Sequence, residues 1–359
     1  MSRILAVPAL AALLVLAACS TPPPAATDGA SGPADPGAEQ ALECAQMVTN
    51  SGGLNDRSFN ETSWAGMQRA DAELGVDANA LVSTTESDLA PNVQAAVDTG
   101  CGFVLTVGYE LVAATQEQAA ANPDVQFAIV DEIVAGENVR SIVFDTAQAA
   151  FLAGYTAASV SETGVVATFG GTNQPPVTLF MDGFAAGIEA YNEAKGTEVR
   201  LLGWDTEEQD GTFTGDYENV SLGQSQTQAF IAQGADVILP VAGQVGEGAF
   251  RASLDAGGEA LVIWVDNDGY ETLPAEFRPL LLTSILKDTE DAVLRAVTDA
   301  VDGSISAEAI IGTLENGGVD IAPFHDLESR VSDETKAELD ALRGQIVAGE
   351  IVIDSPFGR

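Results

Sequence analysis

The chain has 359 residues, a length that is large for one ordinary hydrophobic core and suits two domains. Apolar residues make up 46% of it, which predicts packed globular structure, while 54 acidic residues against 14 basic ones leave a net charge of −40. Because phosphate binding needs a basic surface, this balance argues against nucleic acid as a partner and indicates a solvated acidic surface.

The N-terminus has the pattern of a secretion signal. Arg3 precedes an apolar run at 5–16, and small residues follow. The run Leu16-Ala17-Ala18-Cys19 resembles a bacterial lipobox, in which the cysteine is lipidated and begins the mature protein. We therefore expect a lipoprotein signal peptide at 1–18 and a lipid on Cys19 that holds the protein at the extracytoplasmic face of the cell membrane. The alternatives are an ordinary signal peptide or an uncleaved helix, although the apolar stretch is short for a membrane span.

The next segment, 19–40, is rich in Pro, Ala, Gly, Ser and Asp. Such a composition cannot bury enough apolar surface to order itself, so we expect a flexible tether.

Two cysteines remain once Cys19 is assigned to lipid. Cys44 and Cys101 form a disulfide candidate, because an exported protein meets an oxidising compartment. Each lies near the start of a predicted strand, and neighbouring parallel strands could bring the two sulfurs within bonding range. The alternative is a pair of buried free thiols.

The first half of the chain alternates short apolar runs with amphipathic segments, which is typical of βαβ units and a parallel sheet. Strands are predicted at 45–48, 80–82, 103–107, 127–130 and 139–144, and helices at 61–74, 90–99 and 110–121. These elements predict a Rossmann-like lobe that is complete by about Asp145.

The pattern then restarts. Helices are predicted at 147–160, 177–193, 222–232 and 246–256, and strands at 165–169, 198–204, 237–240 and 261–265, with a polar stretch before Tyr217. A strand at 280–286 and helices at 289–301 and 333–348 follow. The fold class is therefore α/β, with two Rossmann-like lobes.

The division between the lobes depends on where the chain crosses from one to the other. We expect crossings near Asp145, near Asp266 and after Lys287. These assign 41–146 with about 267–290 to the first lobe, and 147–266 with about 291–359 to the second.

Ligands of open α/β sheets bind beyond the carboxyl ends of the strands, so polar or aromatic residues after each strand are candidates. The loop after the first strand contains Asp56, Phe59 and Asn60, and Trp64 follows one turn into the helix. Asp56 and Asn60 can hydrogen-bond to hydroxyls and ring nitrogens, and Phe59 or Trp64 can stack on a flat ring. The alternative is a capped turn with its aromatic side chains in the core.

Later strand ends supply further candidates: Tyr109, Asp131, Phe213, Gly243 and Asp266. Carboxylates suit paired ribose hydroxyls, because one ionised carboxylate accepts two charge-assisted hydrogen bonds. Lys287 ends an apolar strand, where it could form a structural ion pair with a carboxylate of the cleft, contact a ligand, or do both.

Other classes of site lack the residues they need. His325 is the one histidine, so catalysis by a histidine-based triad or a zinc site would have to be built around it alone. The run Asp266-Asn267-Asp268-Gly269 lacks the alternating ligands and closing Glu of a calcium loop. We expect neither a metal nor a cofactor.

Six groups of segments, taken in order, resemble the basic membrane protein family of bacterial lipoproteins, the family of PnrA-like purine-nucleoside receptors. The resemblance covers almost the whole mature chain and rests on 52–60, 151–158, 169–171 with 183–187, 234–243, 265–268 and 283–287. It implies a type I periplasmic-binding-protein fold that closes on a nucleoside and passes it to an ABC importer without chemical change.

The resemblance also implies roles for particular residues. Asp56 and Asn60 would contact the base and Trp64 would stack on it. Asp266 would hold the ribose hydroxyls and Lys287 would add a cationic donor. Asp131 and Gly243 would complete the cleft, and Phe213 is a weaker match for a second stacking residue, because the loop 205–217 departs from the family pattern.

The expected partners are a nucleoside, an ABC permease and, through the lipid, the membrane, with the protein itself a monomer. Two other functions stay open. An exported hydrolase or nucleoside-processing enzyme could use Asp56 and Asp266 as acid and base. A surface sensor or adhesin would bind a protein partner instead of a small molecule.

Overall fold

The computed structural model describes residues 42–356, which belong to one compact unit. The predicted signal peptide at 1–18, the lipid attachment at Cys19 and the tether at 19–40 lie outside the described residues. Within 42–356, the helices lack the combination of length and apolar character that crossing a bilayer requires.

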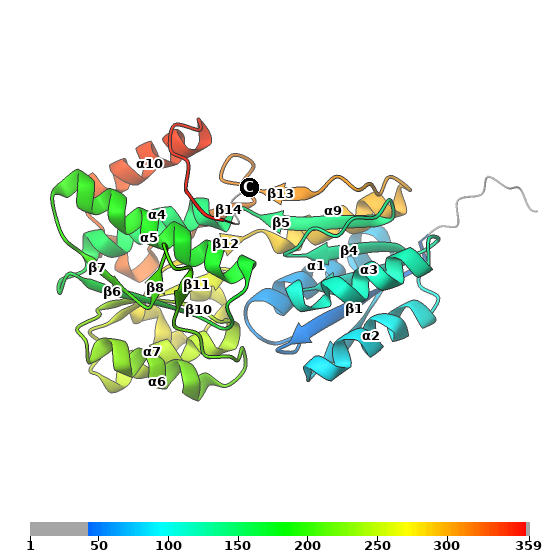
Figure 1. The fold of residues 1–359 in the computed structure, drawn as a ribbon, viewed down its shortest axis with the longest axis horizontal. Helices are drawn as coiled ribbons and strands as arrows, with labels where there is room; N and C mark the ends of the chain where they lie inside the picture. The colour runs from blue at the N-terminus through cyan, green and yellow to red at the C-terminus, as the bar shows by residue number, and fades with distance from the viewer. Residues whose placement is uncertain (1–41, 357–359) are drawn as a thin grey trace, which may run out of the picture. The chain divides into compact units, whose positions relative to one another are not determined.

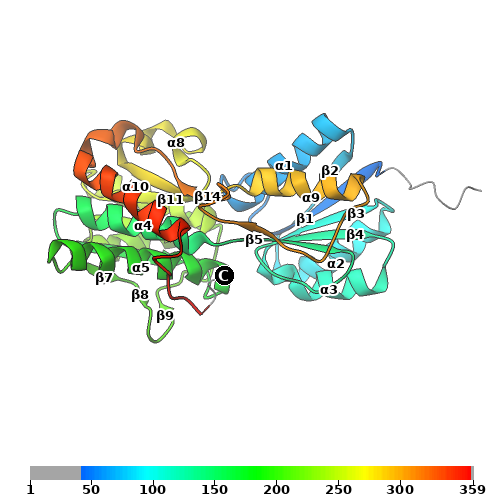
Figure 2. The ribbon, with the colours of Figure 1, turned by 90° about the horizontal axis from the view of Figure 1, so that it is seen from above.

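The first lobe is built on a parallel sheet of six strands in the order β13-β5-β4-β3-β1-β2 (Figure 1). Its strands are β1 (Cys44–Ser51), β2 (Asp77–Ser83), β3 (Phe103–Val107), β4 (Gln126–Val130), β5 (Val139–Phe144) and β13 (Ile310–Gly312). Both faces are covered: α1 (Phe59–Leu74) and α9 (Thr289–Val301) lie on one, and α2 (Glu86–Asp98) and α3 (Val112–Ala121) lie on the other (Figure 2). Because both faces are buried, β3 and the last four residues of β4 are largely apolar runs without polar alternation.

The second lobe repeats the plan, with a six-stranded sheet in the order β14-β12-β11-β10-β6-β7. Its strands are β6 (Val165–Gly170), β7 (Arg200–Leu202), β10 (Val237–Val241), β11 (Leu261–Asp266), β12 (Leu281–Lys287) and the antiparallel edge strand β14 (Val319–Ile321). Helices α4 (Thr146–Val160) and α5 (Pro175–Lys195) cover one face, and α6 (Val220–Ile231) and α7 (Glu247–Asp255) cover the other. The last helix, α10 (Asp333–Val347), packs on α4.

Shorter elements join these layers. They are η1 (Tyr109–Leu111), η2 (Gly243–Gly246), α8 (Gly269–Thr272), η3 (Ala275–Leu280), η4 (His325–Arg330) and the hairpin of β8 (Trp204–Asp205) and β9 (Asp210–Gly211). The predicted single strand at 198–204 is therefore wrong, because the chain turns at Gly203. The φ of Gly203 is +88°, and a Cβ there would lie 2.0 Å from the carbonyl oxygen of Thr168, so only glycine fits.

The chain crosses between the lobes at Asp145, at Asp288 and between Gly312 and Val319, where consecutive elements belong to different sheets or pack on different sheets. The expected crossing near Asp266 is wrong, because β11 and β12 are parallel neighbours that keep 267–287 in the second lobe. The assignment of everything after 291 to the second lobe is also wrong. Helix α9 packs against α1, and β13 pairs with β5, so the chain returns to the first lobe before α10.

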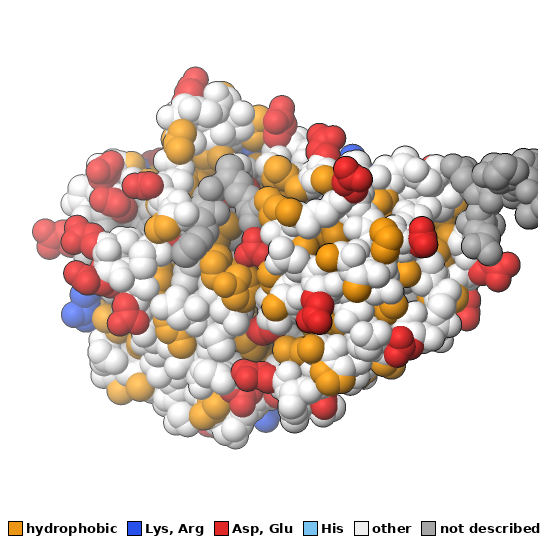
Figure 3. All heavy atoms as spheres, turned by 45° about the vertical axis from the view of Figure 1, so that its right-hand side comes forward, with side chains coloured by type: hydrophobic (Ala, Val, Ile, Leu, Met, Phe, Trp, Pro, Cys, Tyr) orange, Lys and Arg blue, Asp and Glu red, His pale blue; other side chains and the backbone are white. Residues whose placement is uncertain are grey.

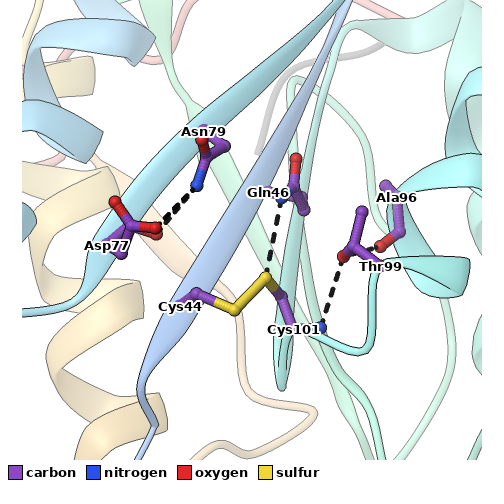
Figure 4. The surroundings of a disulfide bond; sticks show 7 residues. All are labelled: Cys44, Gln46, Asp77, Asn79, Ala96, Thr99 and Cys101. Carbon is purple, nitrogen blue, oxygen red and sulfur yellow. Dashed lines mark hydrogen bonds between the residues drawn. A yellow bond between two sulfur atoms is a disulfide. The ribbon is translucent and has the colours of Figure 1, made fainter. Parts of the chain in front are cut away.

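The disulfide prediction agrees with the structure, in which Cys44 and Cys101 are bonded (Figure 4). Cys44 begins β1, and Cys101 lies two residues before β3, the parallel neighbour of β1. Their Cα atoms are 5.0 Å apart. The disulfide therefore joins the amino ends of β1 and β3, at the edge of the sheet opposite the carboxyl ends of the strands.

Candidate functional site

A pocket with an empty volume of about 650 Å³, part of it open to solvent, is lined by residues from both lobes. The first lobe contributes Asn50, Ser51, Gly52, Asp56, Phe59, Gly108, Tyr109, Glu110 and Asp131, and the second contributes Gln174, Pro176, Val177, Phe180, Tyr217, Val241, Ala242, Gly243, Gln244, Val265, Asp266 and Lys287. Most of them stand at the carboxyl end of a strand or in the loop that follows it. This is the edge at which open α/β sheets bind ligands.

Lys287 is the cation of the pocket. It ends β12, its side chain is 2% exposed, and its Nζ lies 2.8 Å and 2.7 Å from the two carboxylate oxygens of Asp131. Nζ is also 3.8 Å from Asp266 Oδ1 and 4.6 Å from the centre of the Phe59 ring. Lys287 therefore forms the expected ion pair with a carboxylate of the cleft and also lines the pocket, and it links the two lobes.

Asp131 and Asp266 share an unusual backbone conformation. Each has a φ of +73°, in the left-handed region that side chains other than glycine rarely adopt. Asp131 directly follows β4 and Asp266 is the last residue of β11, so the two stand at corresponding places in the two sheets. Such strained residues cluster at functional sites, where the rest of the fold holds them in place.

Asp56 lines the pocket and also caps a helix. Its carboxylate accepts hydrogen bonds from the backbone N–H groups of Ser58 and Glu61, each at 3.0 Å, and of Asn60 at 2.8 Å, and so caps the start of α1. Burial raises the pKa of Asp56 to about 6, against the opposing effect of these three donors. Burial likewise raises the pKa of Asp266, with the Lys287 ammonium opposing the rise. The pocket therefore holds carboxylates whose ionisation is costly without a hydrogen-bonding or cationic partner.

The aromatic side chains in the pocket are Phe59, Tyr109, Phe180 and Tyr217. Sequence reasoning assigned no role to Tyr217. Its hydroxyl lies 2.7 Å from Thr172 Oγ1, and its ring lies so close to Gly171 that a Cβ there would be 2.2 Å from a ring carbon. The pair Gly170-Gly171 at the end of β6 was the available signal, because adjacent glycines leave room for a ring.

Three predicted site residues do not line the pocket. Trp64 is half-buried and packs against the core, because its place on α1 turns it away from the strand ends. Phe213 lies edge-on to Trp204, with ring centres 6.1 Å apart. Asn60 stands behind Asn50, to whose Oδ1 it donates a hydrogen bond of 2.8 Å, while its own Oδ1 is buried without a partner. The rings that do line the pocket come from other positions.

The remaining predicted residues meet in this one pocket: Asp56, Phe59, Tyr109, Asp131, Gly243, Asp266 and Lys287. Gly243 has a φ of +53° and lies beside Tyr217, so its backbone forms part of the wall. The arrangement combines hydrogen-bond acceptors, a single cation and flat rings. It can hold a small ligand that has both a planar ring and hydroxyl groups.

Comparisons with known proteins agree with this arrangement. The family model described as "Bmp: ABC transporter substrate-binding protein PnrA-like" matches residues 45–356. An "ABC transporter nucleoside-binding protein BmpA" from Lactococcus lactis subsp. cremoris (strain MG1363) is 28% identical over 364 residues, which cover 96% of this chain and 98% of that protein. Basic membrane protein A of Borreliella burgdorferi (strain ATCC 35210 / DSM 4680 / CIP 102532 / B31) is 26% identical over 311 residues, or 85% of this chain and 86% of that protein.

Solved structures show the same fold. A solute-binding protein of an ABC transporter system from Aeropyrum pernix K1 superposes with a TM-score of 0.79 at 24% identity and covers 87% of this chain and 93% of that one. A LacI family transcriptional regulator from Enterococcus faecium, solved with bound ribose, superposes with a TM-score of 0.56 at 15% identity, with coverage of 77% and 96%. The fold is therefore of the periplasmic-binding type I class, as the sequence predicts. With its family model matched from the first strand to residue 356, the chain belongs to the PnrA-like family of ABC transporter substrate-binding proteins.

Proposed function

We propose that this protein captures a nucleoside, with a purine as its base, in the pocket between the two lobes and hands it unchanged to an ABC importer. The observation that carries the proposal is the meeting of Asp266, Lys287 and Phe59 in one pocket, although they come from different lobes. The printed name of the Lactococcus lactis relative, a nucleoside-binding protein, supports the same ligand class.

The proposed binding mode follows from the chemistry of the walls. The base packs among Phe59, Phe180 and Tyr217, where apolar area and ring faces are available. The ribose hydroxyls donate to Asp266, whose carboxylate already accepts a hydrogen bond from Ser58 Oγ and retains unused lone pairs. Lys287 offers a donor to ring nitrogens or ribose oxygens from its place between Asp131 and Asp266.

The proposal extends to how the protein is used. A lipid on Cys19 holds it at the extracytoplasmic face of the cell membrane, and the segment 19–40 gives it the reach to meet its permease. It acts as a monomer and performs no chemistry. The support for this part is the lipobox-like sequence and the substrate-binding family.

A ligand panel tests the proposal. The mature protein is melted with adenosine, guanosine, inosine, cytidine and uridine, with ribose and free adenine as controls. A ligand at a hundred times its Kd adds about 2.7 kcal/mol to the free energy of unfolding, so a purine nucleoside is expected to raise the Tm clearly, and the isolated base or sugar much less. Native mass spectrometry of the purified protein then checks for a bound nucleoside.

Chromatography of the incubated ligand separates binding from catalysis. The nucleoside is expected back intact. More than one mole of product for each mole of protein identifies an enzyme and contradicts the proposal, as does the absence of any thermal shift with all five nucleosides.

A further inference from the structure

The loop between β1 and α1 reaches across to the second lobe at a place outside the pocket. We infer that Arg57 and Glu247 form a latch there that sets how long the two lobes stay together and hence how slowly a ligand leaves. The role in ligand release rests on the proposed function. The role in lobe closure does not.

The ion pair itself joins the lobes. Arg57 Nη1 lies 3.2 Å from Oε1 of Glu247, the first residue of α7. The Glu247 side chain is 5% exposed, and its other oxygen lies 3.7 Å from Arg251 Nη2. Arg57 and Glu247 are not among the residues that line the pocket. Their interaction can therefore change without any change in contacts to a ligand.

The backbone of Arg57 is also hydrogen-bonded to the second lobe. The carbonyl oxygen of Arg57 accepts hydrogen bonds from Asn267 Nδ2 at 2.9 Å and from the indole Nε1 of Trp264 at 3.3 Å. The φ of Arg57 is +55°, a left-handed conformation that a non-glycine residue keeps only when its surroundings fix it. The next residue, Ser58, donates from its hydroxyl to Asp266. Two consecutive residues of the first lobe are thus fastened to the second.

Opening the lobes breaks these contacts together. Glu247 would keep Arg251 and its favourable place at the N-terminus of α7, so an open form is tolerated. The ion pairs of Arg57 with Glu247 and of Lys287 with Asp131, however, exist only when the lobes are in contact. Interactions that form after encounter slow dissociation and leave association nearly unchanged.

Other contacts between the lobes lie at the pocket itself. Gln174 Nε2 donates to Glu110 Oε1 at 3.2 Å, and both residues line the pocket. A substitution there would alter ligand contacts and closure at once. Arg57 and Glu247 are therefore the pair whose substitution isolates closure.

The test compares Arg57→Ala and Glu247→Gln with Arg69→Ala as the matched control. Arg69 also pairs with carboxylates, but its partners, Glu73 on α1 and Glu290 and Asp291 on α9, all lie in the first lobe. Stopped-flow dissociation of inosine is expected to be about threefold to tenfold faster in the first two variants, with association within about twofold of the wild type. Arg69→Ala should leave both rates unchanged.

Solution X-ray scattering of the ligand-free variants provides a readout that needs no ligand. Arg57→Ala and Glu247→Gln are expected to have a larger radius of gyration than Arg69→Ala. The double variant should behave like either single one, because both remove the same interaction. If neither inosine nor any other nucleoside of the panel binds, the proposed function fails and the scattering alone decides the latch.

Two results overturn the latch: dissociation rates and radii of gyration equal to those of Arg69→Ala, or single effects that add in the double variant. Thermal melting curves check that a faster dissociation does not come from partial unfolding of the variant. Should Arg57→Ala unfold early, the nearly isosteric Glu247→Gln carries the same test.

Discussion

Lys287 of the second lobe and Asp131 of the first form a two-pronged ion pair inside the pocket, with Nζ 2.8 Å and 2.7 Å from the two carboxylate oxygens. Oδ1 of Asp266 lies 3.8 Å from the same ammonium nitrogen. One buried cation thus serves a partly buried carboxylate of the first lobe and a buried carboxylate of the second. Its removal leaves both without a counter-charge, which is the costly situation for an ion in a protein interior.

Lys287→Met is therefore expected to lower the free energy of unfolding by about 3 kcal/mol and to weaken inosine binding at least about tenfold. Methionine keeps most of the volume of the side chain, so lost packing contributes little. Urea unfolding and titration calorimetry measure the two effects. Lys195→Met is the control, because its partners Glu334 and Glu338 are more exposed and such pairs contribute at most about 1 kcal/mol. Equal losses of unfolding free energy in Lys287→Met and Lys195→Met would show that the buried ion pair stabilises the fold no more than an exposed one does.

The raised pKa of Asp56 has a consequence for stability. Since burial moves this pKa from 3.8 to about 6, the folded protein binds the proton more tightly than the unfolded chain does. The stability that comes from protonation is fully present below about pH 4 and is lost as the pH rises through about 6, to a limit of about 3 kcal/mol. Asp266, whose pKa burial also raises, acts in the same direction.

Asp56→Asn removes the titrating group and keeps an acceptor oxygen at the start of α1. The difference in free energy of unfolding between wild type and variant should therefore shift in favour of the wild type as the pH falls from 7 to 4. Urea unfolding at half-unit steps of pH measures it. Carboxylates distant from Asp56 titrate equally in both proteins and cancel in the difference, so parallel curves would contradict the assignment.

The strand-end residues could be found from the sequence because their place is fixed by the strand before them. Asp131, Asp266 and Lys287 each stand at the end of a buried apolar run, and parallel strands bring such ends to one edge. Trp64 could not be placed in the same way. It lies within a helix, where each residue is rotated by about 100° from the one before, so an uncertainty of one or two residues decides whether a side chain faces the pocket or the core.

The other differences have similar causes. Tyr217 lies in a loop that contacts Gly171 and Thr172, residues distant from it in sequence. Local sequence periodicity cannot predict such contacts. The return of the chain to the first lobe depends on β13 and β14, strands of three residues each. Runs that short carry too little pattern to distinguish them from a loop. The whole-chain resemblance identified the fold without resolving these details.

Helices α4 and α5 pack through glycines that the sequence showed only as part of a resemblance. A Cβ on Gly187 would lie 2.0 Å from the carbonyl oxygen of Phe151, one on Gly154 would lie 2.1 Å from that of Phe184, and one on Gly183 would lie 2.3 Å from that of Ala147. The two backbones are therefore in contact, and any side chain at these positions forces them apart.

Gly187→Ala is accordingly expected to destabilise the protein by about 1–3 kcal/mol, in spite of the better helix propensity of alanine. The matched control is Gly344→Ala in α10, where no atom beyond the surrounding helix backbone lies within 4 Å of the added methyl group. That variant should gain up to about 1 kcal/mol. Thermal or urea unfolding compares the two, and a Gly187→Ala variant as stable as the wild type would mean that the helices can separate at little cost.

The acidic surface makes stability depend on salt. With 54 acidic and 14 basic residues, most carboxylates have no cation to pair with, and exposed pairs such as Arg330 with Glu162 already use part of the small basic complement. Figure 3 shows acidic side chains spread over one face with few basic ones among them. Repulsion of this kind opposes the compact state and weakens as the Debye length falls from about 10 Å at 0.1 M salt to about 3 Å at 1 M.

The Tm at pH 7 is therefore expected to rise by several degrees between 0.1 and 1 M NaCl. Salt can also strengthen apolar burial, so the same series at pH 4.5, where many carboxylates are protonated, serves as the control. Screening predicts a much smaller rise at pH 4.5, because there is less charge to screen. Strengthened apolar burial predicts the same rise at both values, since the buried apolar area does not titrate. Equal slopes would therefore assign the salt effect to the core and leave the acidic surface without a measurable cost to folding.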